Sequence, residues 1–87
     1  MAKIEVRKPT SAEIETMTSW PIWTCPPSTF DWEYSECETC YILEGQVTIK
    51  TVDGDVSFGP GDIVIFPQGL QCVWQVSKAV RKHYQFG

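Results

Sequence analysis

Hydrophobic and polar residues alternate along most of the chain, which is the pattern of β-strands with one buried face. Between Phe30 and Tyr34, three aromatic residues alternate with two acidic ones. Residues 63–66 are apolar at every position, which predicts a central strand. The pattern predicts strands at residues 4–7, 30–34, 40–44, 47–51, 56–58, 63–66, 71–76 and 80–86, and an extended, proline-rich segment at 20–27.

Turn and capping signals separate these segments. Asp53-Gly54 predicts a tight hairpin, because these residues tolerate the positive φ that such turns need. Residues 59–62 predict a second turn. Thr10 and Glu13 have the spacing of a capping box, which predicts a short helix over residues 11–17. Many short strands spaced by turns predict an all-β domain, either a closed barrel or a two-sheet sandwich.

Length and charge narrow the classes of protein. A chain of 87 residues suffices for one domain, and we expect a single domain over residues 1–87. The net charge of −4 does not attract phosphate, so no nucleic-acid partner is expected. The chain contains no apolar run of the ~20 residues that a membrane span needs, and the first eight residues lack a signal-peptide core. We therefore expect a cytoplasmic protein whose four cysteines remain thiols.

Two segments resemble the two motifs of the cupin family. The second motif of that family runs glycine, five residues, proline, one residue, glycine, two residues and histidine. The chain matches it at Gly61, Pro67 and Gly69, and Cys72 stands in the place of the histidine. The first motif ends in a carboxylate, six residues and a glycine, which Glu38 and Gly45 match.

The resemblance extends over nearly the whole chain. Four stretches resemble one subgroup in particular, the small single-domain cupins grouped with the ureidoglycine aminohydrolase cupin domain. These stretches are residues 20–23, 30–32, 38–45 and 81–84. The resemblance implies a small RmlC-like β-barrel, or jelly roll, with one short N-terminal helix.

The usual cofactor of the family does not match the residues present. Cupin enzymes commonly hold a divalent metal with three histidines and a carboxylate, whereas this chain has one histidine, His83, outside both motifs. No cofactor is therefore expected. If a metal does bind, its ligands would be Glu38, Cys72 and either Glu33 or Asp31, which is fewer good donors than such sites favour.

Two registers of the first motif remain open. One turns Trp32 and Tyr34 into the barrel, and the other turns Asp31 and Glu33 inward. We favour the first, because Phe30, Trp32 and Tyr34 form the apolar face of that strand. With this register, the predicted ligand pocket consists of Trp32, Tyr34, Glu38, Cys40, Cys72, Trp74, Lys82 and Tyr84.

Glu38 and Lys82 are the charged members of this predicted pocket. A buried carboxylate needs a partner, and the ammonium of Lys82 could fill the electrostatic role of the missing metal. The pair could contact a ligand or only hold the barrel mouth together. Cys72 could be a nucleophile, a soft metal ligand or an apolar filler, and filler is the commonest role of a buried cysteine. His83 should face away from Lys82, because neighbours in a strand point to opposite faces.

Three hypotheses of function follow. The first is a cupin that binds a small molecule of unknown identity, without the histidine metal site. The alternative is a metal-dependent enzyme related to ureidoglycine aminohydrolase. A Cys-x-x-Cys redox or zinc site at Cys37 and Cys40 is disfavoured, because residues three apart in a strand point to opposite faces. The third hypothesis is a structural or assembly module, a homodimer formed through residues 3–7 and 20–23, which is compatible with either of the other two. Catalytic residues are not predicted.

Overall fold

The computed structural model describes residues 3–87, which form seven strands and one helix. In chain order the elements are β1 (Glu5–Arg7), α1 (Ser11–Met17), β2 (Ile22–Cys25), β3 (Ser28–Glu33), β4 (Glu38–Thr51), β5 (Gly54–Phe58), β6 (Ile63–Phe66) and β7 (Gln71–Phe86). The predicted domain also includes residues 1 and 2, which lie outside the described part of the chain. Within residues 3–87, no helix is long and apolar enough to cross a membrane.

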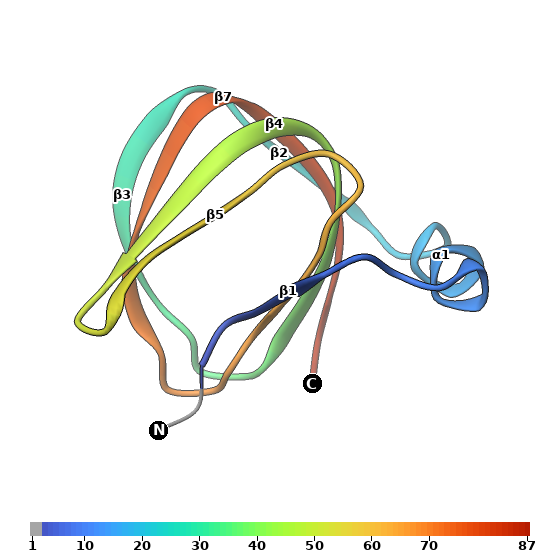
Figure 1. Cartoon of the computed structure of the whole chain (residues 1–87), viewed down its shortest axis with the longest axis horizontal. Helices are drawn as coiled ribbons and strands as arrows, with labels where there is room; N and C mark the ends of the chain where they lie inside the picture. The colour runs from blue at the N-terminus through green and yellow to red at the C-terminus, as the bar shows by residue number, and fades with distance from the viewer. Residues whose placement is uncertain (1–2) are drawn as a thin grey trace.

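The two longest strands, β4 and β7, pair antiparallel and form the centre of the sheet. On the edge of β7 opposite to β4, β3 pairs with residues 71–76 and β2 pairs with residues 80–83. Strands β5 and β6 pair with the other edge of β4, and β1 extends the sheet beyond β6. Figure 1 shows the sheet curling around its interior, with α1 outside it. This architecture confirms the predicted all-β barrel with one short N-terminal helix.

Strand β4 is continuous, although the sequence predicted one strand ending at Glu44-Gly45 and another beginning at Val47. The pairing of β4 with β7 shifts register between Ile42 and Val47. Gly45 lies in this stretch with a φ of 108°. Extra residues in one strand of a pair bend it without ending it, and glycine inside a strand marks such places. The predicted break between residues 76 and 80 was wrong for the same reason, since β7 also runs through.

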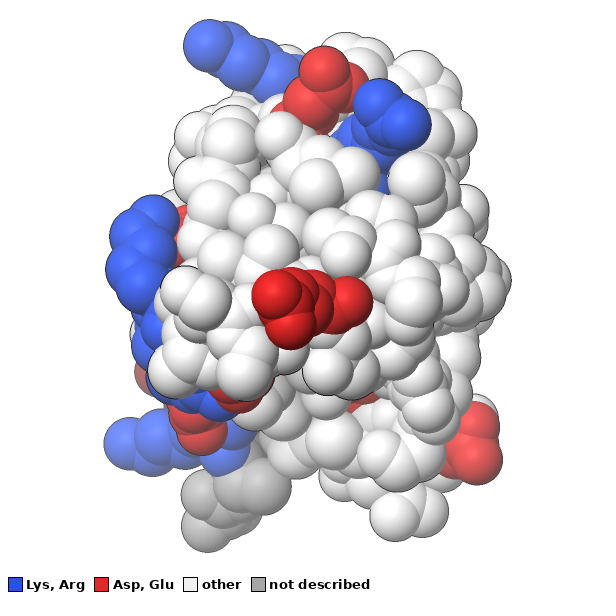
Figure 2. Space-filling model, turned by 90° about the vertical axis from the view of Figure 1, so that its right-hand side faces the viewer, with Lys and Arg blue, Asp and Glu red and all other residues white. Residues whose placement is uncertain are grey.

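The predicted capping box is present at the start of α1. The Glu13 amide donates to Thr10 Oγ1 at 3.2 Å, and the Thr10 amide donates to a Glu13 carboxylate oxygen at 2.9 Å. Arg7 also pairs with Glu13 at 2.7 Å, which ties β1 to the helix. Figure 2 views this side of the molecule and shows lysine and arginine side chains along its margins, next to acidic ones.

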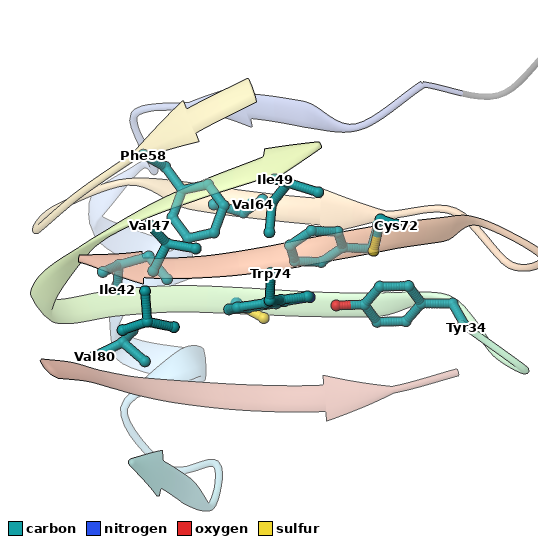
Figure 3. Packing of buried hydrophobic residues seen from close by; sticks show 12 residues of the cluster. Tyr34, Ile42, Val47, Ile49, Phe58, Val64, Cys72, Trp74 and Val80 are labelled. Atoms are coloured by element: carbon teal, nitrogen blue, oxygen red, sulfur yellow. The ribbon is translucent and has the colours of Figure 1, made fainter. Parts of the chain in front are cut away.

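The interior of the barrel is filled by one hydrophobic cluster, whose inward-facing members come mainly from β4, β6 and β7. Trp74 lies in its middle, and its ring centroid is 5.5 Å from that of Phe66 and 6.0 Å from that of Phe58. Figure 3 shows Tyr34 pointing its hydroxyl group inward, toward Trp74. The buried cluster is Tyr34, Cys40, Ile42, Val47, Ile49, Phe58, Val64, Phe66, Cys72, Trp74, Val76 and Val80.

Candidate functional site

A cavity of about 260 Å³ adjoins this core. Seven of its nine lining residues are aromatic, and the other two are Glu38 and Lys82. We call it the aromatic cavity. Its rim is formed by Trp32 and Phe86, which are 47% and 42% exposed. Its floor is formed by Tyr34, Glu38 and Lys82, none of which is more than 4% exposed. The full lining is Trp23, Phe30, Trp32, Tyr34, Glu38, Trp74, Lys82, Tyr84 and Phe86.

Strand alternation places the two charged residues on the floor. Glu38 is the first residue of β4, and every second residue after it, to Ile42, is buried. Lys82 lies on β7 directly opposite Trp23 of β2 and Ile42 of β4. Because side chains alternate across a strand, both charged groups turn to the inside of the sheet.

Tyr34 follows β3 and is held by backbone hydrogen bonds. Its amide donates to the Leu70 carbonyl at 2.9 Å, and its carbonyl accepts from the Gly69 amide at 2.7 Å. This loop belongs to the Gly61–Cys72 motif singled out in the sequence. The motif therefore fixes the position of a floor residue through its backbone.

The floor is a buried ion pair with a hydroxyl group attached. Lys82 Nζ donates to Glu38 Oε2 at 2.9 Å, and the Tyr34 hydroxyl donates to Glu38 Oε1 at 2.8 Å. The ammonium also lies 3.3 Å from Cys40 Sγ, and 4.9 and 4.7 Å from the ring centroids of Trp23 and Trp74. At these distances the aromatic rings attract the cation, so its charge is balanced by both Glu38 and the two indoles.

Two thiols and one phenol lie near the ion pair, and burial favours the neutral form of each. Burial raises the pKa of the Cys40 thiol, and the nearby Lys82 ammonium only partly offsets this effect. Burial and the Glu38 charge raise the pKa of the Cys72 thiol. The same two causes raise the pKa of the Tyr34 phenol. A thiolate is the reactive form of cysteine, so neither Cys40 nor Cys72 is activated as a nucleophile here.

These raised pKa values predict that the protein loses stability at alkaline pH. In the unfolded chain the thiols ionise near pH 9 and the phenol near pH 10, whereas in the folded protein burial raises the pKa of each of the three groups above these values. Their contribution is therefore complete below about pH 9 and falls as the pH rises, by up to about 1.4 kcal/mol per pH unit for each group. Urea titrations between pH 8 and 10.5 test this, and a flat free energy of unfolding would contradict it.

Six of the eight predicted pocket residues line the aromatic cavity: Trp32, Tyr34, Glu38, Trp74, Lys82 and Tyr84. Cys40 lies behind it against Lys82. Cys72 packs in the core and borders a separate groove of about 610 Å³ with Asp31 and Glu33. Within residues 3–87 all the cysteines are free thiols.

Three lining residues were missed by the sequence analysis. Phe30 stands on the same strand face as Trp32, which could have identified it. Phe86 continues the face of Lys82 and Tyr84 along β7. Trp23 was interpreted as packing for the N-terminal segment, and it reaches the cavity because β2 pairs with β7 beside Lys82.

The structure has the register that turns Tyr34 inward, whereas Asp31 and Glu33 are exposed. His83 faces away from Lys82, as expected from strand alternation. It is not a surface residue, since it is 7% exposed beneath the segment after α1. Its Nδ1 lies 2.8 Å from the Trp20 carbonyl oxygen, which can only accept, so Nδ1 carries the proton.

The residues at the floor do not fit a divalent metal. An ammonium group already occupies the position beside Glu38, and the nearest other donors are a phenol and a protonated thiol. Glu33 points away and accepts a hydrogen bond from Gln71 instead. Among residues 3–87, no three His, Cys, Asp or Glu side chains come together as a possible metal site. The structure thus does not assemble the ligand set Glu38, Cys72 and Glu33 or Asp31.

The small curled β-barrel, with Tyr34 held at the cavity floor by the Gly61–Cys72 motif, agrees with the cupin class. Comparison with known families makes this specific, because residues 13–84 match the EutQ-like cupin domain. The chain belongs to this family. No match is found among curated proteins. The finer resemblance to ureidoglycine aminohydrolase cupins stays a prediction.

Solved structures support the same assignment. A DUF861 family protein from Thermotoga maritima is 44% identical, with a TM-score of 0.92 over 98% of this chain and 100% of that one. The EutQ protein of Clostridium difficile is 25% identical, with a TM-score of 0.69 over 75% of this chain and 52% of that one. A DUF861 protein from Pseudomonas syringae is 26% identical, also with a TM-score of 0.69, over 76% of this chain and 29% of that one. The chain thus resembles the Thermotoga maritima protein over its full length and parts of the other two, which are longer.

Proposed function

We propose that this cupin binds a small organic molecule in the aromatic cavity, and that the Lys82–Glu38 pair replaces the metal of other cupins. The observation that carries the proposal is the ion pair at the floor of an otherwise aromatic cavity. Ligand sites are typically apolar clefts with a few placed polar groups. The alternative of a metal-dependent enzyme has no comparable support, because the donors do not converge.

The size of the cavity indicates a small ligand. Sites for drug-sized molecules occupy about 300–1,000 Å³, whereas this cavity has about 260 Å³. A molecule of one ring with a polar substituent is of the right order. Flat rings suit the lining, because contact between two aromatic rings contributes about 0.5–1.5 kcal/mol in addition to the free energy gained by burying their surface.

The proposal can be tested with four single-ring probes: benzamide, benzoate, benzylammonium and toluene. Calorimetry should detect binding of at least one of them. The Trp32→Ala variant should weaken that binding at least tenfold, because Trp32 supplies an exposed wall of the cavity. Absence of binding by all four probes at millimolar concentration would overturn the proposal.

The matched control is Val52→Ala. Val52 is 94% exposed and lies outside the aromatic cavity. This variant should bind the probe as the original protein does. Equal losses in Val52→Ala and Trp32→Ala would place binding elsewhere and would also count against the proposal.

A further inference from the structure

The unused hydrogen-bonding capacity of the cavity floor indicates what kind of ligand it takes. Each carboxylate oxygen accepts two hydrogen bonds and an ammonium donates three. Oε1 of Glu38 accepts from Tyr34, and Oε2 accepts from Lys82. Lys82 also donates to Cys40. The Cys40 thiol is also hydrogen-bonded to Glu38. Counted over residues 3–87, at least one acceptor position therefore remains on the Glu38 carboxylate, and one donor remains on Lys82.

The floor is also electrically neutral. The Glu38 carboxylate and the Lys82 ammonium lie 2.9 Å apart, and their side chains are 4% and 5% exposed. The other lining residues are aromatic and carry no charge. A charged ligand would bring an uncompensated charge into a buried, apolar site, which is strongly unfavourable. An anion would also approach the Glu38 carboxylate, and a cation would approach the Lys82 ammonium.

We propose that the ligand is a neutral, planar molecule that carries an N–H group beside a carbonyl group, such as a primary aromatic amide or a lactam ring. Its N–H would donate to Glu38, and its carbonyl oxygen would accept from Lys82. Its ring would lie between the aromatic walls. This inference rests on the proposed function, because it concerns the ligand of the same cavity.

Calorimetry with matched probes tests the ligand class separately from the function. Benzamide should bind at least tenfold more tightly than benzoate, benzylammonium or toluene, which keep the ring and change only the substituent. Tighter binding of any of the other three would overturn the neutral-amide class and leave the proposed function standing. If none of the four binds, both proposals fail.

A change in the charge of the cavity floor should change which of the four probes binds most tightly. Glu38→Gln leaves Lys82 uncompensated, so benzoate should gain at least tenfold in affinity relative to benzamide. Circular dichroism checks that this variant is folded. Glu36→Gln is the matched control, because Glu36 is exposed and outside the cavity. A Glu38→Gln protein that folds and keeps the original order of affinities would overturn the inference. The comparison of probes on the unchanged protein remains decisive if that variant does not fold.

Discussion

Replacement of Gly45 by alanine should remove about 3–5 kcal/mol from the free energy of unfolding. A Cβ atom at this position would lie 2.6 Å from the Ala79 carbonyl oxygen and 2.6 Å from the Val80 Cα. Both contacts are with backbone, so no side chain can rotate away from them. The φ of 108° adds strain of about 1–3 kcal/mol for any residue with a Cβ. Small domains are stable by only about 5–15 kcal/mol, so this single methyl group threatens the fold.

Gly54→Ala separates the two effects. Gly54 has a φ of 123°, and a Cβ there would meet no atom within 4 Å. This variant should lose only the strain, about 1–3 kcal/mol. Urea denaturation of both variants gives the comparison. Equal losses in the two would mean that the contact with β7 is not what requires a glycine at residue 45.

Replacement of Lys82 by methionine should destabilise the protein by about 3–5 kcal/mol, because it leaves the buried Glu38 carboxylate without its counter-ion. The hydrogen bond from the Tyr34 hydroxyl would remain, but it brings no compensating charge. Methionine has a side chain of similar length and packs well against aromatic rings, so lost packing contributes little. Thermal and urea denaturation measure the change.

The double variant Glu38→Gln, Lys82→Met shows whether charge is the cause. It should recover most of the loss, because the double variant contains no buried charge that lacks a counter-ion. Lys50→Met is the control for an exposed pair, because Lys50 and Asp55 are 3.1 Å apart with side chains 47% and 52% exposed. That variant should change stability by less than about 1 kcal/mol. A double variant no more stable than Lys82→Met would show that the pair does not act through its charges.

Strand alternation explains why so much of the site could be predicted. Tyr34, Glu38, Trp74 and Lys82 each lie on the buried side of a period-two pattern, and the cupin motifs supplied the register that brings them together. Periodicity says which face a residue is on, but not how far along the barrel it lies. Cys72 shares the inward face with Trp74 and pairs with Trp32 across the sheet, yet it packs in the core and does not line the aromatic cavity.

The continuity of the long strands could not be predicted in the same way. A Glu-Gly pair ends many strands, and nothing local distinguishes it from a bulge. The difference is set by Ala79 and Val80, which lie against Gly45 only after β4 and β7 have paired. Trp23 was missed for a similar reason, since its place beside Lys82 depends on the pairing of β2 with β7.

Whether the protein forms a homodimer through β1 stays a prediction.

The position of β7 at the centre of the sheet also determines when the protein can fold during its synthesis. Within residues 3–87, strands β2 and β3 pair with β7 alone, so they have no partner until residues 71–86 have been made, whereas β4 can already pair with β5 and β6. At about 5–20 residues per second, the ribosome takes roughly one to three seconds to add this strand. Trp23, Phe30 and Trp32 are exposed during that interval. The aromatic residues that form the cavity are thus surfaces that a chaperone can bind on the nascent chain, and they become a binding site only after β7 has paired.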